Sequence, residues 1–262
     1  MTDENPLVLR QDDAGVATLT LNRPAARNAL SHAMLRALRA AFDTIAADAA
    51  VRVVILAGAG PGFCAGHDLK EVRANQDDRR FAESLFEECA ELMLAIVRLP
   101  KPVIARVHGI ATAAGCQLVA TCDLAVAGED ARFATPGVNI GLFCSTPMVA
   151  LSRNATPKQA MQMLLTGDLI DAQTALRFGL LNEVVPAAAL EARTAALARQ
   201  LASKSPLTLA IGKEAFYRQL ELPLTQAYDY TRRTMVENLQ TLDAREGIAA
   251  FIDKRPATWC GR

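Results

Sequence analysis

The sequence contains two small-residue stretches, Phe63-Cys64-Ala65-Gly66-His67-Asp68-Leu69 and Gly109-Ile110-Ala111-Thr112-Ala113-Ala114-Gly115-Cys116-Gln117-Leu118. Each stretch follows an apolar run and precedes a segment that suits a helix. Small residues let the backbone approach a ligand closely, and a helix N-terminus presents free N–H groups. Two such loops can each direct one N–H at a carbonyl oxygen, which is the arrangement of an oxyanion hole. Neither stretch places a carboxylate where an acid–base catalyst would be expected.

The segments around these stretches predict an α/β fold. The predicted strands are Val8–Arg10, Val16–Leu21, Val51–Ala57, Val103–Val107 and Asp123–Ala127. The predicted helices are one that begins after the N-cap Ser31, then Phe81–Leu99, Gly115–Thr121, Pro157–Leu165, Asp171–Phe178, Pro186–Ala202, Pro206–Leu220 and Leu224–Leu239. The recurring order of strand, loop and helix is typical of a mostly parallel sheet with helices packed outside it. We therefore expect a ligand-binding core over residues 1–200 and a helical region over residues 201–262 that packs on the core or on another subunit.

The composition restricts the possible classes of function. Lys+Arg and Asp+Glu both number 28 in 262 residues, which gives no electrostatic reason to expect binding to nucleic acid or to a membrane surface. The six cysteines form no C-x-x-C pair, so we expect free thiols and no metal site. The longest apolar stretch, Ile110–Cys122, is too short to span a bilayer, which takes about 18 residues. Met1–Asn5 has neither the pattern of a signal peptide nor that of a transit peptide, so a soluble cytoplasmic protein is expected.

Several further motifs occur in a defined order along the chain. They are Leu21-Asn22-Arg23-Pro24, Arg27-Asn28-Ala29-Leu30, Phe63–Lys70, Lys101–Ala105, Gly115-Cys116 with Cys122-Asp123, Leu165-Thr166-Gly167, Ala172 with Ala175 and Gly179-Leu180, and Ala250-Phe251 with Lys254-Arg255. In these motifs, and essentially from end to end, the chain resembles the enoyl-CoA hydratase/isomerase (crotonase) superfamily. The runs Ala111–Cys122 and Phe133–Pro147 resemble those of one group of mammalian enoyl-CoA hydratase domain-containing proteins.

The resemblance implies a fold, a ligand and an assembly. The fold is a crotonase spiral of ββα units with a helical C-terminal trimerisation region. The ligand is an acyl-CoA thioester, so coenzyme A would arrive as part of the substrate and no cofactor would be bound permanently. The assembly is a homotrimer or a hexamer built as a dimer of trimers.

The resemblance also implies roles for individual residues. The backbone N–H groups of His67 and Ala114 are the expected oxyanion donors. The residues expected to contact the CoA ligand are His67, Asp68, Leu69, Lys70 and Ala114. Lys254 is expected to reach a CoA phosphate, with a contact across a subunit boundary as one route, and Arg23 and Arg27 are further candidates for this contact.

Two positions depart from the hydratase pattern. The glutamates that hydratases carry are replaced here by Gln117 and Gly137. Glutamine can hydrogen-bond a water molecule but cannot take its proton, and glycine can do neither. Each lost acid–base partner typically costs about 10²–10⁴-fold in rate. We therefore expect little hydration by a pair of glutamates, whereas a backbone oxyanion hole is retained.

Three kinds of function stay open on this basis. The first is an enzyme that stabilises the enolate of a CoA thioester. Decarboxylation of a malonyl-type CoA fits best, because loss of CO₂ generates the enolate without a base. The second is an acyl-CoA thioesterase that uses Cys144 or Ser145 as its nucleophile. The third is an acyl-CoA-binding homo-oligomer without catalysis. The His67 side chain is either a catalytic group or a polar residue that lines the mouth of the site.

Overall fold

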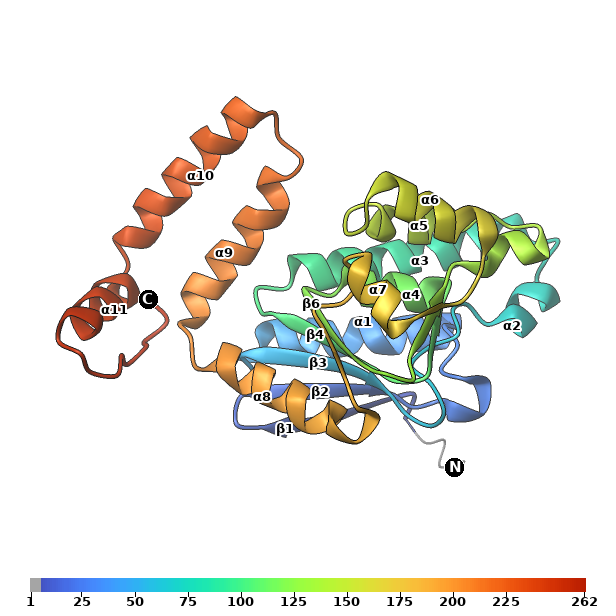
Figure 1. Ribbon diagram of the computed structural model, residues 1–262, viewed down its shortest axis with the longest axis horizontal. Helices are drawn as coiled ribbons and strands as arrows, with labels where there is room; N and C mark the ends of the chain where they lie inside the picture. The colour runs from blue at the N-terminus through green and yellow to red at the C-terminus, as the bar shows by residue number, and fades with distance from the viewer. Residues whose placement is uncertain (1–5) are drawn as a thin grey trace.

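Two β-sheets form the centre of the computed structural model, which describes residues 6–262 (Figure 1). The larger sheet has the strand order β1-β2-β3-β4-β6-β9, and the smaller has the order β5-β7-β8. The strands are β1 Val8–Asp13, β2 Val16–Leu21, β3 Val53–Gly58, β4 Val103–Val107, β5 Ile110–Thr112, β6 Leu124–Gly128, β7 Arg132–Ala134, β8 Ile170–Asp171 and β9 Glu183–Val185. β1 and β2 form an antiparallel hairpin, and β2, β3, β4, β6 and β9 run parallel. The five predicted strands and the mostly parallel sheet are thus confirmed, while the short strands β5, β7, β8 and β9 were not predicted.

Helices provide the crossovers that parallel strands require. They are α1 His32–Ala47, α2 Leu69–Ala74, α3 Arg79–Arg98, α4 Ala114–Thr121, α5 Ser145–Leu151, α6 Pro157–Thr166, α7 Ala172–Arg177, α8 Leu190–Ala202, α9 Pro206–Gln219, α10 Leu224–Leu239 and α11 Leu242–Ile252, with 3-10 turns η1 Pro24–Ala26, η2 Pro136–Ile140 and η3 Ala187–Ala189. Among the described residues no helix is long and apolar enough to cross a membrane.

The apolar stripes of α1 and α3 build much of the core. The Ser31 hydroxyl accepts the N–H of Met34 and caps α1, as the sequence predicts. Leu38 and Phe42 of α1 are almost fully buried. Phe86 of α3 is less buried, with 44% of it exposed. Phe86 lies at the edge of the stripe, where its ring meets that of His67 edge-on with centroids 5.4 Å apart.

The helices after residue 205 extend away from the sheets, whereas α8 packs against β3, β4 and β6 (Figure 1). A buried polar cluster ties α9 to the core. Lys213 Nζ lies 2.7 Å from Asp123 Oδ2, and the Tyr217 hydroxyl donates to Asp123 Oδ1 at 2.9 Å. Burial lowers the pKa of Lys213, with the Asp123 charge opposing the shift. Removal of either charge would leave the other buried and uncompensated.

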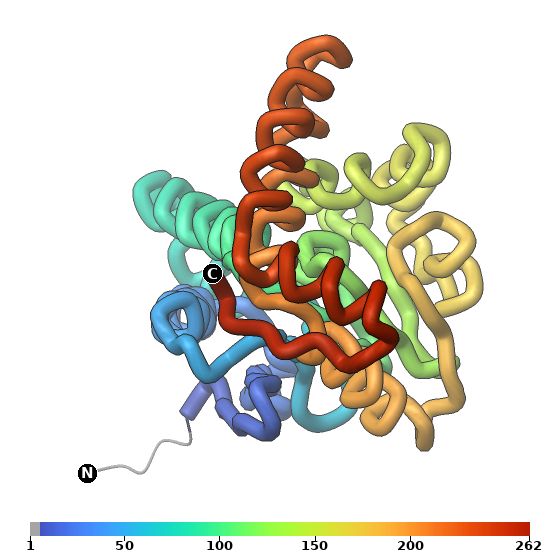
Figure 2. The backbone as a smooth tube through the Cα atoms, turned by 90° about the vertical axis from the view of Figure 1, so that its left-hand side faces the viewer, coloured from blue at the N-terminus to red at the C-terminus, as the bar shows by residue number. Residues whose placement is uncertain are grey.

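The C-terminal segment turns back beneath α10 and α11 (Figure 2). The buried Asp243 carboxylate in α11 receives the Ser205 hydroxyl at 2.5 Å and the N–H groups of Cys260 and Gly261 at 2.7 and 3.1 Å. Desolvation alone would raise the pKa of Asp243, but these hydrogen bonds outweigh it and the pKa lies below its usual range. The carboxylate thus joins the start of α9 to the chain end.

Candidate active site

The two small-residue stretches are held side by side by main-chain contacts. Cys64 pairs with Ala111 as a parallel bridge between them. Gly66 meets the second stretch so closely that a Cβ added to it would lie 2.8 Å from Ala113 Cβ and 3.3 Å from the backbone N of Ala114. A residue with a side chain would therefore fill the space beside the Ala114 amide. The structure brings the two predicted oxyanion segments together at this point.

The backbone N–H groups of His67 and Ala114 make no hydrogen bond to the described part of the protein. The chain on either side of His67 is paired with Leu30, because Leu30 donates to Gly66 O at 2.8 Å and Asp68 donates to Leu30 O at 3.2 Å. Ala114 is the first residue of α4, where no carbonyl lies one turn earlier in the helix. Within residues 6–262 neither N–H has a hydrogen-bond acceptor.

Backbone strain sets the direction of the second amide. Ala113 has φ 51° and ψ −120°, a conformation that a residue with a Cβ rarely adopts. Such strain costs about 1–3 kcal/mol and persists only where surrounding contacts enforce it. Here the Ala113 N–H donates to Ala134 O at 2.9 Å, and its carbonyl accepts the N–H of Gln117 at 3.0 Å.

A residue to which the sequence analysis gave no role, Asn28, organises the first loop. It is fully buried with φ 55°, and its Nδ2 group donates to the carbonyls of Ala59, Gly62 and Phe63 at 2.8–3.1 Å. Its Oδ1 accepts the N–H of Arg23 at 2.9 Å. Asparagine tolerates this left-handed conformation better than most residues. The Arg27-Asn28 motif marks Asn28 in the sequence, but the three carbonyls that it binds lie more than 30 residues away, so this contact could not be predicted.

Asp68 is engaged in structure rather than being free for a ligand. Its Oδ1 accepts the N–H groups of Lys70 and Glu71 at 3.0 and 3.4 Å and so caps α2, and its Oδ2 lies 2.7 Å from Arg23 Nη1. Desolvation raises the pKa of Asp68, but the bonds from Arg23 and from the two amides outweigh it, so the net shift is downward. Leu69 and Lys70 are exposed beside this cap.

The other candidates for CoA contacts lie at different distances from the two loops. Arg27, in the left-handed conformation with φ 50°, lines a hollow of about 190 Å³ together with Pro61, Gly62, Ala65 and Ile110. Lys254 follows α11, which lies at the opposite end of the molecule from α2 (Figure 1). One chain therefore does not bring Lys254 to its own oxyanion segments.

The two positions without a glutamate differ in their surroundings. Gln117 is 5% exposed, and its Oε1 is buried without a partner among residues 6–262. A Cβ at Gly137 would lie 2.6 Å from Leu142 O and 2.9 Å from Cys144 Sγ. Gly137 is therefore required by the local packing. A glutamate cannot be placed there without moving the backbone at Leu142.

The two predicted nucleophiles are poorly activated. Burial raises the pKa of the Cys144 thiol, and a hydrogen bond to Gly137 only partly opposes this shift. Ser145 is the exposed first residue of α5, and its hydroxyl lies 3.4 Å from Phe143 O. Within the described chain no hydrogen bond joins either group to a basic side chain. The five cysteines before residue 145 are buried and free, as predicted, but Cys260 is exposed.

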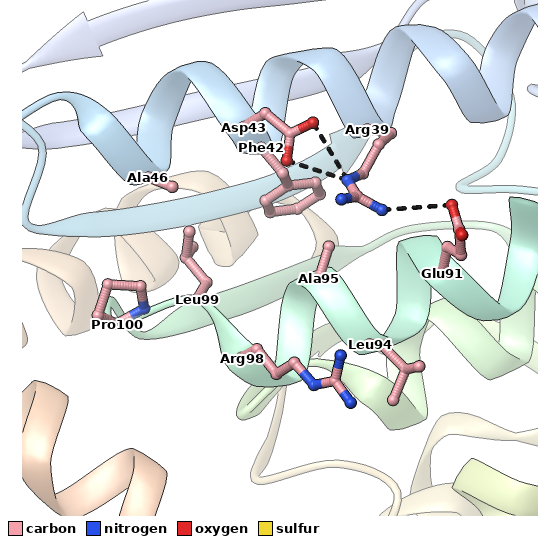
Figure 3. Close-up of a pocket in the computed structure, with 10 residues that line it drawn as sticks. All are labelled: Arg39, Phe42, Asp43, Ala46, Glu91, Leu94, Ala95, Arg98, Leu99 and Pro100. Carbon is pink, nitrogen blue, oxygen red and sulfur yellow. Dashed lines mark hydrogen bonds and ion pairs between the residues drawn. The ribbon is translucent and has the colours of Figure 1, made fainter.

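A larger hollow, of about 340 Å³, lies between α1 and α3 (Figure 3). Two arginines line it, Arg39 and Arg98, and Arg39 is paired with Asp43 at 3.0 Å and with Glu91 at 3.6 Å. None of the sequence-predicted site residues lines it. The hollow is thus separate from the two oxyanion segments.

Comparison with known proteins shows the family of this chain. Residues 11–262 match the family model for enoyl-CoA hydratase/isomerase, and the chain belongs to this family. It is 48% identical to mouse enoyl-CoA hydratase domain-containing protein 3, mitochondrial, over 95% of this chain and 83% of the mouse protein. A crystal structure of enoyl-CoA hydratase from Mycobacterium smegmatis is 55% identical, has a TM-score of 0.95 and covers 97% of this chain and 99% of its own. The human domain-containing protein 3 structure is 45% identical with a TM-score of 0.93, covering 97% of this chain and 100% of its own. The family resemblance and the crotonase fold are confirmed.

The predicted cytoplasmic location is wrong by the same comparison. Five vertebrate relatives, 46–48% identical to this chain, are all named as mitochondrial proteins. The sequence argument relied on Met1–Asn5, and these residues lie outside those that the structure describes.

Proposed function

We propose that this protein binds an acyl-CoA thioester with the carbonyl oxygen between the N–H groups of His67 and Ala114, and stabilises the enolate of the bound acyl group. The observation that supports this most strongly is the pair of unbonded amides on two segments that touch at Gly66. Preorganised donors of this kind stabilise negative charge on oxygen, each by about 3 kcal/mol in the transition state. The strained Ala113 and the buried Asn28 fix the donors before a ligand arrives.

The surroundings of the amides support a coenzyme A ligand. The hollow beside Arg27 adjoins the first oxyanion segment through Ala65. The Lys70 side chain is exposed at the start of α2. A guanidinium and an ammonium group in these positions suit a ligand that carries several phosphates.

The same contacts favour enolate chemistry over the alternatives. Two-glutamate hydration has no support, because Gln117 cannot act as a base and Gly137 has no space for a side chain. Thioester hydrolysis through Cys144 or Ser145 has no base to activate the nucleophile. Stabilisation of charge on the thioester oxygen needs only the main chain.

We also propose a homotrimer, or a hexamer made of two trimers. Large apolar side chains on the C-terminal helices stand exposed, among them Leu224 at 75%, Tyr228 at 70% and Phe251 at 86%. Patches of this kind mark surfaces that another protein covers. In such an assembly Lys254 of one copy would reach the CoA phosphates of another. Light scattering tests this assembly, and a monomeric mass would contradict it.

A matched pair of ligands tests the proposed function. Butyryl-CoA carries the thioester carbonyl, and S-butyl-CoA is the thioether that lacks it. Each amide that donates to a neutral carbonyl contributes about 1 kcal/mol, so calorimetry should show butyryl-CoA binding about 10- to 30-fold more tightly. Equal affinity for the two ligands, or binding of neither, would refute the proposal.

A further inference from the structure

The His67 side chain is held in one tautomer. Its Nδ1 lies 3.3 Å from the carbonyl oxygen of Leu30. A carbonyl oxygen can only accept, so Nδ1 carries the proton and Nε2 keeps a free lone pair. The edge-on contact with Phe86 holds the plane of the ring.

The lone pair on His67 Nε2 is buried and accepts no hydrogen bond from the described residues. His67 Nε2 is inaccessible to solvent and has no hydrogen-bond partner within residues 6–262. Gln117 Oε1 and Thr135 Oγ1 are two of the other three such atoms in this part of the chain. Gln117 is three residues beyond Ala114, and Thr135 follows Ala134, whose carbonyl accepts the Ala113 N–H. Buried polar atoms without partners are rare, so three of them beside the oxyanion segments indicate groups that a bound ligand meets.

The other titratable groups beside the two amides cannot take a proton. Asp68 is committed to Arg23 and to the cap of α2. The thiols of Cys116 and Cys144 have raised pKa values, because burial disfavours their thiolates. Gln117 does not titrate. Among these groups, the imidazole of His67 alone combines a free lone pair with a suitable basicity.

We propose that Nε2 of His67 accepts the α-proton of the bound acyl thioester, and returns it, in place of the two absent glutamates. The α C–H bond breaks as an N–H bond forms on Nε2, its electron pair forms the C=C bond of the enolate, and the π pair of the carbonyl moves to the thioester oxygen between the two amides. The reverse step restores the thioester. This inference rests on the proposed function. It is sterically consistent with that function, because the covalent geometry of histidine keeps Nε2 within about 6 Å of the residue's own amide.

The charges around His67 support a neutral imidazole. Burial lowers the pKa of His67, the bond to Leu30 opposes the shift, and His32 adds to the lowering. The charged or titratable groups on the surrounding elements are His32 on α1, Glu71 on α2, Glu88 on α3, Arg36 on α1, and Asp68 with Arg23. Glu88 is already bonded to His32 and Arg36, so it is not available to charge His67. The imidazole is therefore a free base near neutral pH.

Exchange of α-protons for deuterium tests the proposal. Butyryl-CoA is incubated with the protein in D₂O, and ¹H NMR follows the loss of the α-methylene signal. His67→Gln keeps the main-chain donor and an amide that can bond Leu30 O, but it is not a base. We expect its exchange rate to fall by about 10²–10⁴-fold, while its affinity for butyryl-CoA stays within a few-fold of wild type. His108→Gln is the matched control, because His108 Nε2 contacts Gly60 O and has no role in the site. It should keep the wild-type rate.

The pH dependence gives a second measurement that needs no variant. The exchange rate should rise with pH and level off, with a midpoint below the ordinary histidine value of about 6.5. Exchange by His67→Gln at the wild-type rate, a profile flat across this range, or wild-type binding of butyryl-CoA without exchange would each overturn the inference and leave the proposed function standing. Failure to bind butyryl-CoA would refute both this inference and the proposed function.

Discussion

Replacement of Gly66 by alanine should close the space in which the thioester oxygen is proposed to lie. Gly66 has φ 91°, and alanine in a left-handed conformation costs about 1–2 kcal/mol. The 2.8 Å contact of the new Cβ with Ala113 Cβ adds about 1–3 kcal/mol of overpacking. Alanine also reduces the conformational freedom of the unfolded chain, which favours the folded state by about 0.4–1 kcal/mol. We therefore expect Gly66→Ala to lower the free energy of unfolding by about 2–4 kcal/mol.

The chain provides a matched control at Gly141. Gly141 also has a positive φ, 77°, but no heavy atom of the described residues lies within 4 Å of an added Cβ. Gly141→Ala should therefore cost only about 1 kcal/mol, because the conformational strain acts without the overpacking. Urea denaturation followed by circular dichroism measures both variants, and the difference between them isolates the effect of the filled space.

The same pair of variants separates stability from ligand binding. The new methyl group of Gly66→Ala lies 3.3 Å from the Ala114 nitrogen. This variant should bind butyryl-CoA no more tightly than S-butyl-CoA, whereas Gly141→Ala should keep the wild-type preference. The reasoning is refuted if Gly66→Ala is as stable as Gly141→Ala and still prefers butyryl-CoA.

Three further predictions concern the rest of the chain. Gly137→Glu should lower the stability of the protein and give no gain in crotonyl-CoA hydration, because the new Cβ would lie 2.6 Å from Leu142 O. A folded, soluble variant that hydrates crotonyl-CoA faster than wild type would contradict this. Lys213→Met should lower the free energy of unfolding by about 3–5 kcal/mol, because the Asp123 carboxylate then lacks its positive partner. Thermal denaturation measures this, and an unchanged melting temperature would show that the pair does not hold α9 to the core. The pKa of Asp243 is lowered in the folded state, so its stabilising contribution is present above about pH 4 and is lost as the pH falls through the folded value. Asp243→Asn should therefore flatten the acid limb of the unfolding free energy below about pH 4, and an unaltered limb would contradict it.

Local features of the fold could be predicted from the sequence. Ser31 is a good N-cap, and the spacing of the apolar residues after it gives the buried face of α1, both of which depend on neighbours in sequence. Helix α11 was missed although its signal was present. Thr241 caps this helix and Asp243 lies in its first turn. Helical periodicity alone would place Phe86 in the buried stripe of α3, because it cannot show that the stripe ends beside His67.

The candidate site depended on contacts between distant segments. The sequence predicted two loops able to present amides, but their meeting at Gly66 and Ala113 required the three-dimensional structure. The lack of space at Gly137 has a local cause, because Leu142 O approaches it from the turn that follows η2, and the sequence does not show the form of that turn. The tautomer of His67 is set by Leu30, which precedes it by 37 residues. Local sequence patterns therefore predict the helices and strands, whereas the arrangement of the site residues depends on how these elements pack.

The central claim concerns polarisation of a thioester carbonyl by two main-chain amides, and it can be measured on the carbonyl itself. Butyryl-CoA labelled with ¹³C at the carbonyl carbon is bound to the protein, and its chemical shift is compared with that of the free ligand. Two N–H donors on the oxygen predict a downfield shift for wild type and for Gly141→Ala, and a smaller one for Gly66→Ala. A bound carbonyl that resonates at the position of the free ligand would contradict the account.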